Sequence, residues 1–199
     1  MNYENTKKGI KYLYYASLFM IVSNLSLLFT SSQNETLKTI ANVLAIIGLI
    51  GYILSLIGVR ICSKDDSGYH QAYIFAIIGL IVGIIGYVIA LIVKIDWISD
   101  CTKTITNFCD FMIVWQVLFT SSYILNKLGK NELADSAIKT SYLFLGCFIA
   151  TIIYLCYCNS SGIVSNIMNS SILSLLVSAI GIIGTIKYFL FLRKMKKEI

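Results

Sequence analysis

The run from Ala72 to Val93 contains no charged residue, and fourteen of the twenty residues from Ile74 to Val93 are Ile, Leu, Val or Phe. A helix needs about 20 mostly apolar residues to cross the hydrocarbon core of a bilayer. At about −0.3 to −0.6 kcal/mol each, these fourteen side chains favour insertion by about 4 to 8 kcal/mol in total. The run therefore predicts a membrane-spanning helix and restricts the rest of the chain to folds that suit lipid.

The composition of the whole chain agrees with this prediction. Of its 199 residues, 57% are hydrophobic and only 13% are charged, and the mean hydropathy is +0.80. Soluble domains carry about a quarter charged residues, which cover their surface. Only helices and closed barrels satisfy the backbone in lipid, and barrel strands alternate apolar and polar residues. Since no long alternation occurs, we predict an all-α, polytopic integral membrane helical bundle.

Six apolar runs mark the expected transmembrane helices of one domain that covers residues 1–199. With the N-terminus inside, thirteen of the sixteen Lys and Arg residues fall in inner segments. Basic residues are retained on the cytoplasmic side during insertion, so we predict cytoplasmic N and C termini in a plasma membrane protein. The net charge of +6 is then explained by basic residues that orient the helices and contact anionic lipid, not by binding to nucleic acid. The expected partner is the lipid bilayer. The runs are 10–30, 39–59, 70–93, 108–128, 140–158 and 171–192.

The connections between these runs give further expectations. Residues 94–110 show near-helical spacing of apolar side chains and predict a short helix that lies in the membrane interface. The segment 129–139 predicts one or two amphipathic turns, and Gly68 is the expected positive-φ residue of a tight turn. The passage Ile53–Ile89 loosely resembles helix-turn-helix segments of small bacterial and archaeal membrane proteins. That resemblance implies two antiparallel helices and no residue roles.

Small residues recur in the third run with gaps of four and three residues, which places them on one face of a helix. In lipid, apolar side chains gain little from mutual contact, and small residues let two backbones approach closely. We interpret the face as a helix-packing surface, although glycine is frequent in membrane helices in general. Similar series in 39–59 and 171–192 predict a tight core of these two spans with 70–93. The packing residues are Ala72, Ala76, Gly79, Gly83, Gly86 and Ala90.

Few ionisable residues fall inside the predicted spans. Asp110 and His70 are expected at span ends, so the sequence indicates no proton relay and no site for a strongly charged substrate. The polar residues Asn24 and Gln116 lie deeper, and Asn42 lies nearer the outer end of its span. They are expected to bond between helices, or alternatively to line a polar pathway for a solute or ion.

Cysteine is the other chemically active residue type, and four of the six cysteines are expected near the outer face. Unpaired thiols and two disulfides both remain open for this group. A zinc site is not expected, because the group has no histidine and no CxxC pair. The four are Cys101, Cys109, Cys156 and Cys158.

These observations indicate a membrane protein and leave its activity open. We predict a non-catalytic component, without cofactor or metal, that packs with itself or with a partner membrane protein. The alternative is a transporter or channel-like protein for a small neutral solute or ion. An enzyme is not expected, although His70 together with Asp65 or Asp66 would revive that possibility if they met in a pocket.

Overall fold

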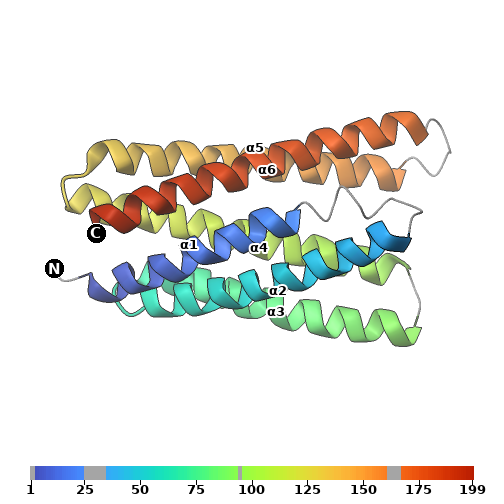
Figure 1. Cartoon of the computed structure of the whole chain (residues 1–199), viewed down its shortest axis with the longest axis horizontal. Helices are drawn as coiled ribbons and strands as arrows, with labels where there is room; N and C mark the ends of the chain where they lie inside the picture. Colours follow the sequence, from blue (N-terminus) through green and yellow to red (C-terminus); the bar gives the residue numbers. More distant parts are fainter. Residues whose placement is uncertain (1–2, 25–34, 94–95, 161–166) are drawn as a thin grey trace.

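The computed structural model is a bundle of six α-helices that lie roughly along one axis (Figure 1), and it describes residues 3–24, 35–93, 96–160 and 167–199. The all-α class predicted from the sequence is thereby confirmed. The helices are α1 (Glu4–Asn24), α2 (Glu35–Cys62), α3 (Ser67–Val93), α4 (Asp96–Lys127), α5 (Asn131–Ser160) and α6 (Ile167–Glu198).

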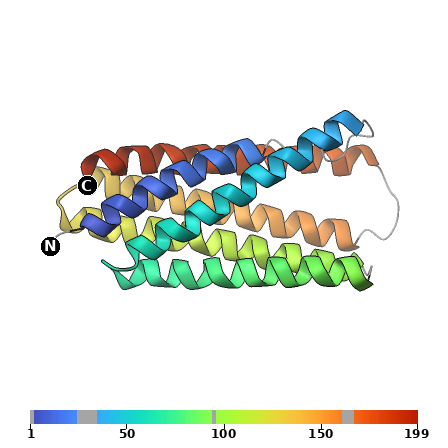
Figure 2. The same cartoon turned by 60° about the horizontal axis from the view of Figure 1, so that its bottom comes forward.

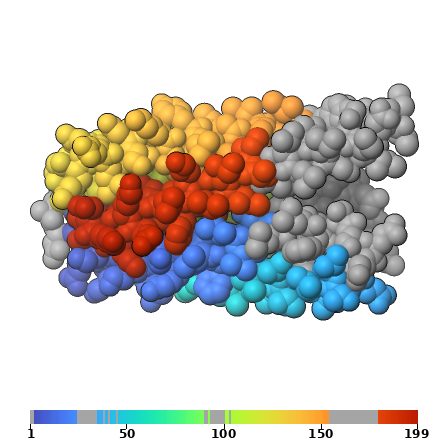
Figure 3. All heavy atoms as spheres, turned by 45° about the horizontal axis from the view of Figure 1, so that its top comes forward, coloured from blue at the N-terminus to red at the C-terminus, as the bar shows by residue number. Residues whose placement is uncertain are grey.

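The helices pack in a closed ring. Each packs on its neighbours in sequence, and α6 packs on α1. Figure 3 shows α6 lying between α5 and α1 on one face of the molecule. Because consecutive helices are antiparallel, both termini and the α2–α3 and α4–α5 turns share one end of the bundle (Figure 1). The segments at this end, called the terminal end below, carry the thirteen basic residues assigned to the inner side.

Four helices are long and apolar enough to cross a membrane within the part of the chain that the structure describes. They are Glu35–Cys62, Ser67–Ile89, Thr104–Lys127 and Asn131–Ile153. The distribution of side chains on α3 agrees with lipid contact, because Ala72 is fully buried while Ile85 is 52% exposed. A surface rich in exposed apolar side chains is typical of a membrane interaction. The chain is thus a helical protein with candidate transmembrane helices.

The prediction of a separate interfacial helix at 94–110 is wrong. From Asp96 onward this segment forms the first turns of α4, a single helix of 32 residues. It is about 48 Å long at 1.5 Å per residue, well beyond the hydrocarbon thickness of about 30 Å. No glycine or proline occurs between Asp96 and Lys127, so nothing in the backbone ends the helix where hydropathy falls.

The turn predictions need one correction. Gly68 lies inside α3, where its N–H donates to the Asp66 carboxylate at 2.8 Å, so Asp66 caps the helix. The positive φ belongs instead to Gly129, at 74°, which ends α4 and leads directly into α5. Glycine is the usual residue in this position because it carries no Cβ.

The small-residue face of α3 lies against α4. Ala72 and Ala76 are buried, and an added Cβ at Gly79 would come within 3.0 Å of the Cys109 Cβ. At Gly86 an added Cβ would come within 2.7 Å of the Thr102 Cβ. The side chain of Ala90 lies outside the described residues.

The expected common core of spans 39–59, 70–93 and 171–192 is wrong. Helix α2 uses its small residues against α1, where an added Cβ at Gly9 would lie 2.6 Å from the Gly58 carbonyl oxygen. Helix α6 packs on α5 and α1. Neighbours in sequence pack as antiparallel hairpins, and they cover the faces that the pattern assigned to more distant helices. Away from their turn, α2 and α3 diverge (Figure 2).

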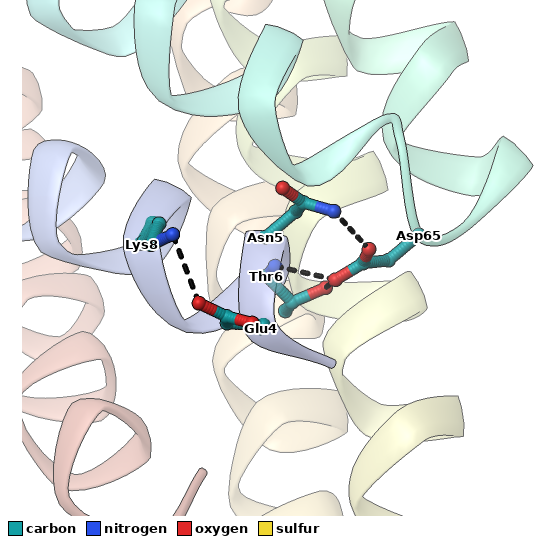
Figure 4. A network of polar contacts seen from close by, with 5 residues as sticks. All are labelled: Glu4, Asn5, Thr6, Lys8 and Asp65. Carbon is teal, nitrogen blue, oxygen red and sulfur yellow. Dashed lines mark hydrogen bonds and ion pairs between the residues drawn. The ribbon is translucent and has the colours of Figure 1, made fainter. Parts of the chain in front are cut away.

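A carboxylate in the α2–α3 turn holds the start of α1. Asp65 Oδ2 accepts hydrogen bonds from the Thr6 N–H at 2.6 Å and the Thr6 hydroxyl at 2.9 Å, and Oδ1 accepts one from the Asn5 amide at 2.7 Å (Figure 4). The free N–H groups and positive dipole of a helix N-terminus favour a carboxylate here. Partial burial raises the pKa of Asp65, but these hydrogen bonds outweigh it and hold the pKa below its ordinary value.

We expect Asp65→Asn to lower stability by about 1 to 2 kcal/mol at neutral pH, because it weakens several charge-assisted hydrogen bonds. A lowered pKa stabilises the fold above the ordinary value of about 3.9, and this contribution disappears as the pH falls through the lower folded value. The difference between the two proteins should therefore shrink below about pH 4. Thermal unfolding in detergent at several pH values measures it. Glu4→Gln is the control, since it removes only an exposed ion pair with Lys8; an equal loss in both variants would contradict the capping role.

We expect Gly86→Ala to destabilise the α3–α4 pair by about 1 to 3 kcal/mol, because the new methyl group would overlap Thr102. Gly83→Ala is the matched control on the same face. There the nearest atom is a Thr106 methyl carbon at 3.7 Å, which is ordinary contact. Thermal unfolding of both variants in one detergent compares them, and equal stability would contradict close packing at Gly86.

Candidate functional site

A cavity of about 790 Å³ lies inside the ring, and all six helices contribute to its described wall. The volume is within the usual range of about 300 to 1,000 Å³ for small-molecule sites. Most wall residues are aliphatic or aromatic, and the aromatic ones come from four different helices. These are Tyr52, Tyr87, Phe144 and Tyr188.

Packed side chains separate the cavity from the terminal end. Tyr188 is only 3% exposed and makes an edge contact with Phe144, with 6.0 Å between the ring centroids. The Tyr52 hydroxyl donates to the Ala76 carbonyl at 2.7 Å and so bridges α2 and α3. Beyond these residues the buried core, which includes Tyr69 and Leu118, fills the bundle toward the termini. The cavity therefore occupies the middle of the bundle and the half away from the termini.

The wall contains one carboxylate, that of Asp110 on α4. Its side chain is exposed to the cavity, and among the described residues it makes no hydrogen bond or ion pair. No Lys, Arg or His belongs to the described wall. The carboxylate lies inside the candidate span Thr104–Lys127, six residues or about 9 Å from its start. An unpaired charge at such a position is costly and usually marks a functional site.

Several other polar groups of the wall have partners within the protein. The hydroxyls of Ser17, Thr106 and Thr185 donate to backbone carbonyls of their own helices at 2.7, 3.0 and 2.9 Å. The Asn24 amide donates to the Thr185 hydroxyl at 3.2 Å and links α1 to α6. Asp110 differs from all of these because its side chain is the only carboxylate of the described wall.

The structure does not bring the three predicted pathway residues together. Asn24 lines the cavity and bonds between helices, so it combines both roles considered for it. Asn42 is exposed on α2, and Gln116 is half-buried on α4. Neither is among the described residues that line the cavity.

Sequence reasoning placed Asp110 at the outer end of a span and missed its position inside the bundle. The error followed from starting span four at residue 108, whereas the candidate span begins at Thr104 and α4 at Asp96. A carboxylate within 24 residues of uninterrupted helix was the signal that could have identified it. The expectation that Asp110 lies at the outer end of its span is corrected accordingly.

The remaining candidate groups do not converge with this site. Asp65 is engaged by the start of α1, and His70 is exposed on α3 with its ring 6.3 Å from that of Tyr73. Cys101 and Cys109 are free thiols, whereas the side chains of Cys156 and Cys158 lie outside the described residues. Among the residues that could be searched, no cluster of three His, Cys, Asp or Glu side chains could hold a metal ion.

Comparison with known proteins identifies no relative of this chain. No protein-family model matches the chain, and no curated protein and no solved structure matches it either.

We expect the hydrophobic reagent dicyclohexylcarbodiimide to modify Asp110 in preference to the other nine acidic residues. The reagent partitions into apolar surroundings and reacts with protonated carboxyl groups, and Asp110 is exposed to a cavity whose wall is mostly apolar. Peptide mass spectrometry of the labelled protein locates the adduct. In Asp110→Asn the principal adduct should disappear. Equal labelling of surface carboxylates such as Asp135 would contradict this assignment of the site.

Proposed function

We propose that this chain is a six-span plasma membrane protein with cytoplasmic termini, without catalytic activity, that takes a small solute or ion into its central cavity and moves it across the bilayer. The observation that carries the proposal is the unpaired Asp110 carboxylate in a mostly apolar cavity inside the bundle. A polar side chain is retained in such surroundings when it contacts a ligand or lines a pathway.

The ring of helices supports six spans. Helices α1 and α6 complete the wall of the cavity together with the four candidate spans. We therefore expect all six helices to lie at the same depth in the bilayer. At the terminal end, Tyr12 and Tyr15 are 40% and 51% exposed, and the Lys196 ammonium lies 4.3 Å from the centre of the Tyr14 ring. Exposed tyrosines beside lysines are typical of a membrane–water interface. Together with the excess of basic residues, they favour a cytoplasmic position for this end.

The packing of small residues favours a solute-binding role over the role of a packing component. The stripe on α3 contacts α4 within the same chain, and the small residues of α2 contact α1. These faces are therefore occupied before any second protein arrives. Association with a second copy or with a partner membrane protein stays a prediction of the sequence.

Movement of a solute through the protein requires a change at the inner wall of the cavity. Tyr52, Phe144 and Tyr188 lie between the cavity and the packed core. They are linked to their neighbours by the Tyr52–Ala76 hydrogen bond and the edge contact of the Phe144 and Tyr188 rings, and all three pack in or against the core. We propose that these three side chains form the barrier that opens in transport.

Gly83→Leu provides the test, because this glycine lines the cavity and leaves room for a side chain. We expect the protein in proteoliposomes to pass glycerol or tetraethylammonium, and Gly83→Leu to reduce the rate at least tenfold by filling the cavity. The control is Gly146→Leu, which adds the same side chain at an exposed site with no atom within 4 Å.

Two results would contradict the proposal. One is a folded wild-type protein that passes neither probe above the rate of empty liposomes. The other is a Gly83→Leu variant that transports as fast as Gly146→Leu. Epitope tags at the two ends, tested for accessibility in intact cells, check the topology separately, and a tag accessible from outside would contradict cytoplasmic termini.

A further inference from the structure

We infer that the occupant of the cavity is a monovalent organic cation with an apolar body, and that it exchanges with a proton at Asp110. This inference rests on the proposed function and specifies its substrate class.

The charge of the site calls for one positive charge in the occupant. Asp110 carries the only carboxylate of the described wall, and no basic side chain there neutralises it. A buried charge without a partner is strongly disfavoured, so the carboxylate either holds a proton or pairs with a cation. An anionic occupant would add a second negative charge, and a divalent cation would leave one positive charge unpaired. A monovalent cation makes the site neutral.

The size of the cavity and the absence of a ligand cluster favour an organic cation over a metal ion. Hard metal cations take about six to eight oxygen ligands within about 2.6 Å. The described wall contains a single carboxylate, and the searched residues contain no cluster of three His, Cys, Asp or Glu side chains that could hold a metal ion. A cavity of about 790 Å³ accommodates a drug-sized molecule.

The chemistry of the wall suits an apolar body that carries the charge. Tyr52, Tyr87 and Phe144 present aromatic rings from three helices, and aliphatic residues such as Leu80 and Ile84 fill much of the remaining wall. Aromatic faces attract cations, and most strongly where water is excluded. The aliphatic wall binds the rest of the molecule by removing its apolar surface from water.

The requirement that the site carries no net charge also implies that the cation exchanges with a proton. When the cation arrives, the carboxylic acid of Asp110 releases its proton to water, and the carboxylate forms an ion pair with the cation, so the site stays neutral. The other titratable wall residues are Tyr52 on α2, Tyr87 on α3 and Tyr188 on α6, and the described walls of α1 and α5 contain none. Asp110 is the one carboxyl group of the described wall, so it is the group that can release a proton when the cation binds.

The experiment measures binding to the full chain in detergent by calorimetry. The probes are methyltriphenylphosphonium and its neutral analogue triphenylphosphine oxide. We expect the cation to bind, with an affinity that falls as the pH is lowered by up to tenfold per pH unit. Asp110→Asn should weaken cation binding at least tenfold and remove the pH dependence, while Asp110→Glu should retain both. The neutral analogue should bind equally to wild type and Asp110→Asn.

Several results would overturn the inference. They are equal binding of the cation and the neutral analogue, unchanged cation binding by a folded Asp110→Asn protein, complete displacement of the phosphonium by millimolar Na⁺ or K⁺, or no binding of either probe to folded wild type. None of these results bears on whether Gly83→Leu slows the flux of probe solutes through the protein. The cavity can therefore be a solute pathway even if its substrate is not a cation.

Discussion

The close approach of helix backbones at glycine is the constraint on which the arrangement of the bundle depends. At Gly9 and Gly58 the backbones of α1 and α2 almost touch, and at Gly79 and Gly86 helix α3 approaches the side chains of α4 equally closely. These contacts tie the helices into pairs, since small residues are what lets helices associate in lipid. Helices α2 and α3 belong to different pairs, and they diverge away from their turn (Figure 2). The cavity lies where the pairs face each other, because no large side chain extends inward from the glycine positions that line it.

The cavity wall combines hydroxyls that bond within the protein with a carboxylate that does not. In lipid, polar groups need partners inside the protein, and several hydroxyls of the wall find them in backbone carbonyls. Asp110 departs from this pattern, and its position is fixed by α4, a helix without internal glycine or proline. A rigid helix holds the carboxylate at one depth whatever the cavity contains. The charge is therefore a fixed feature of the site, and the occupant must adapt to it.

The sequence predicted where the helices lie more accurately than which helices pack together. Apolar runs located all six, and the expected start of span 70–93 lies three residues from that of α3, because hydropathy reports directly on lipid contact. Hydropathy does not report where a helix ends in water, so the extension of α4 to Asp96 was missed, and with it the depth of Asp110. The spacing of Gly79, Gly83 and Gly86 indicated a packing face but carried no information on which helix covers it. The Asp65 cap was also beyond prediction, since it joins residues 59 positions apart in the sequence.

The terminal end of the bundle is held by contacts of several kinds. Buried residues such as Leu118 and Met195 fill the centre of the ring, Asp65 fixes the start of α1, and Lys130 pairs with Glu198 at 2.7 Å. Next to this core the described residues of all six helices line the cavity, and the Asn24–Thr185 hydrogen bond joins α1 to α6 across its wall. Well-packed segments open only at high free energy. The packed core therefore supplies a fixed frame at one end of the cavity, and Asp110 lies on the wall of the cavity and not within that core.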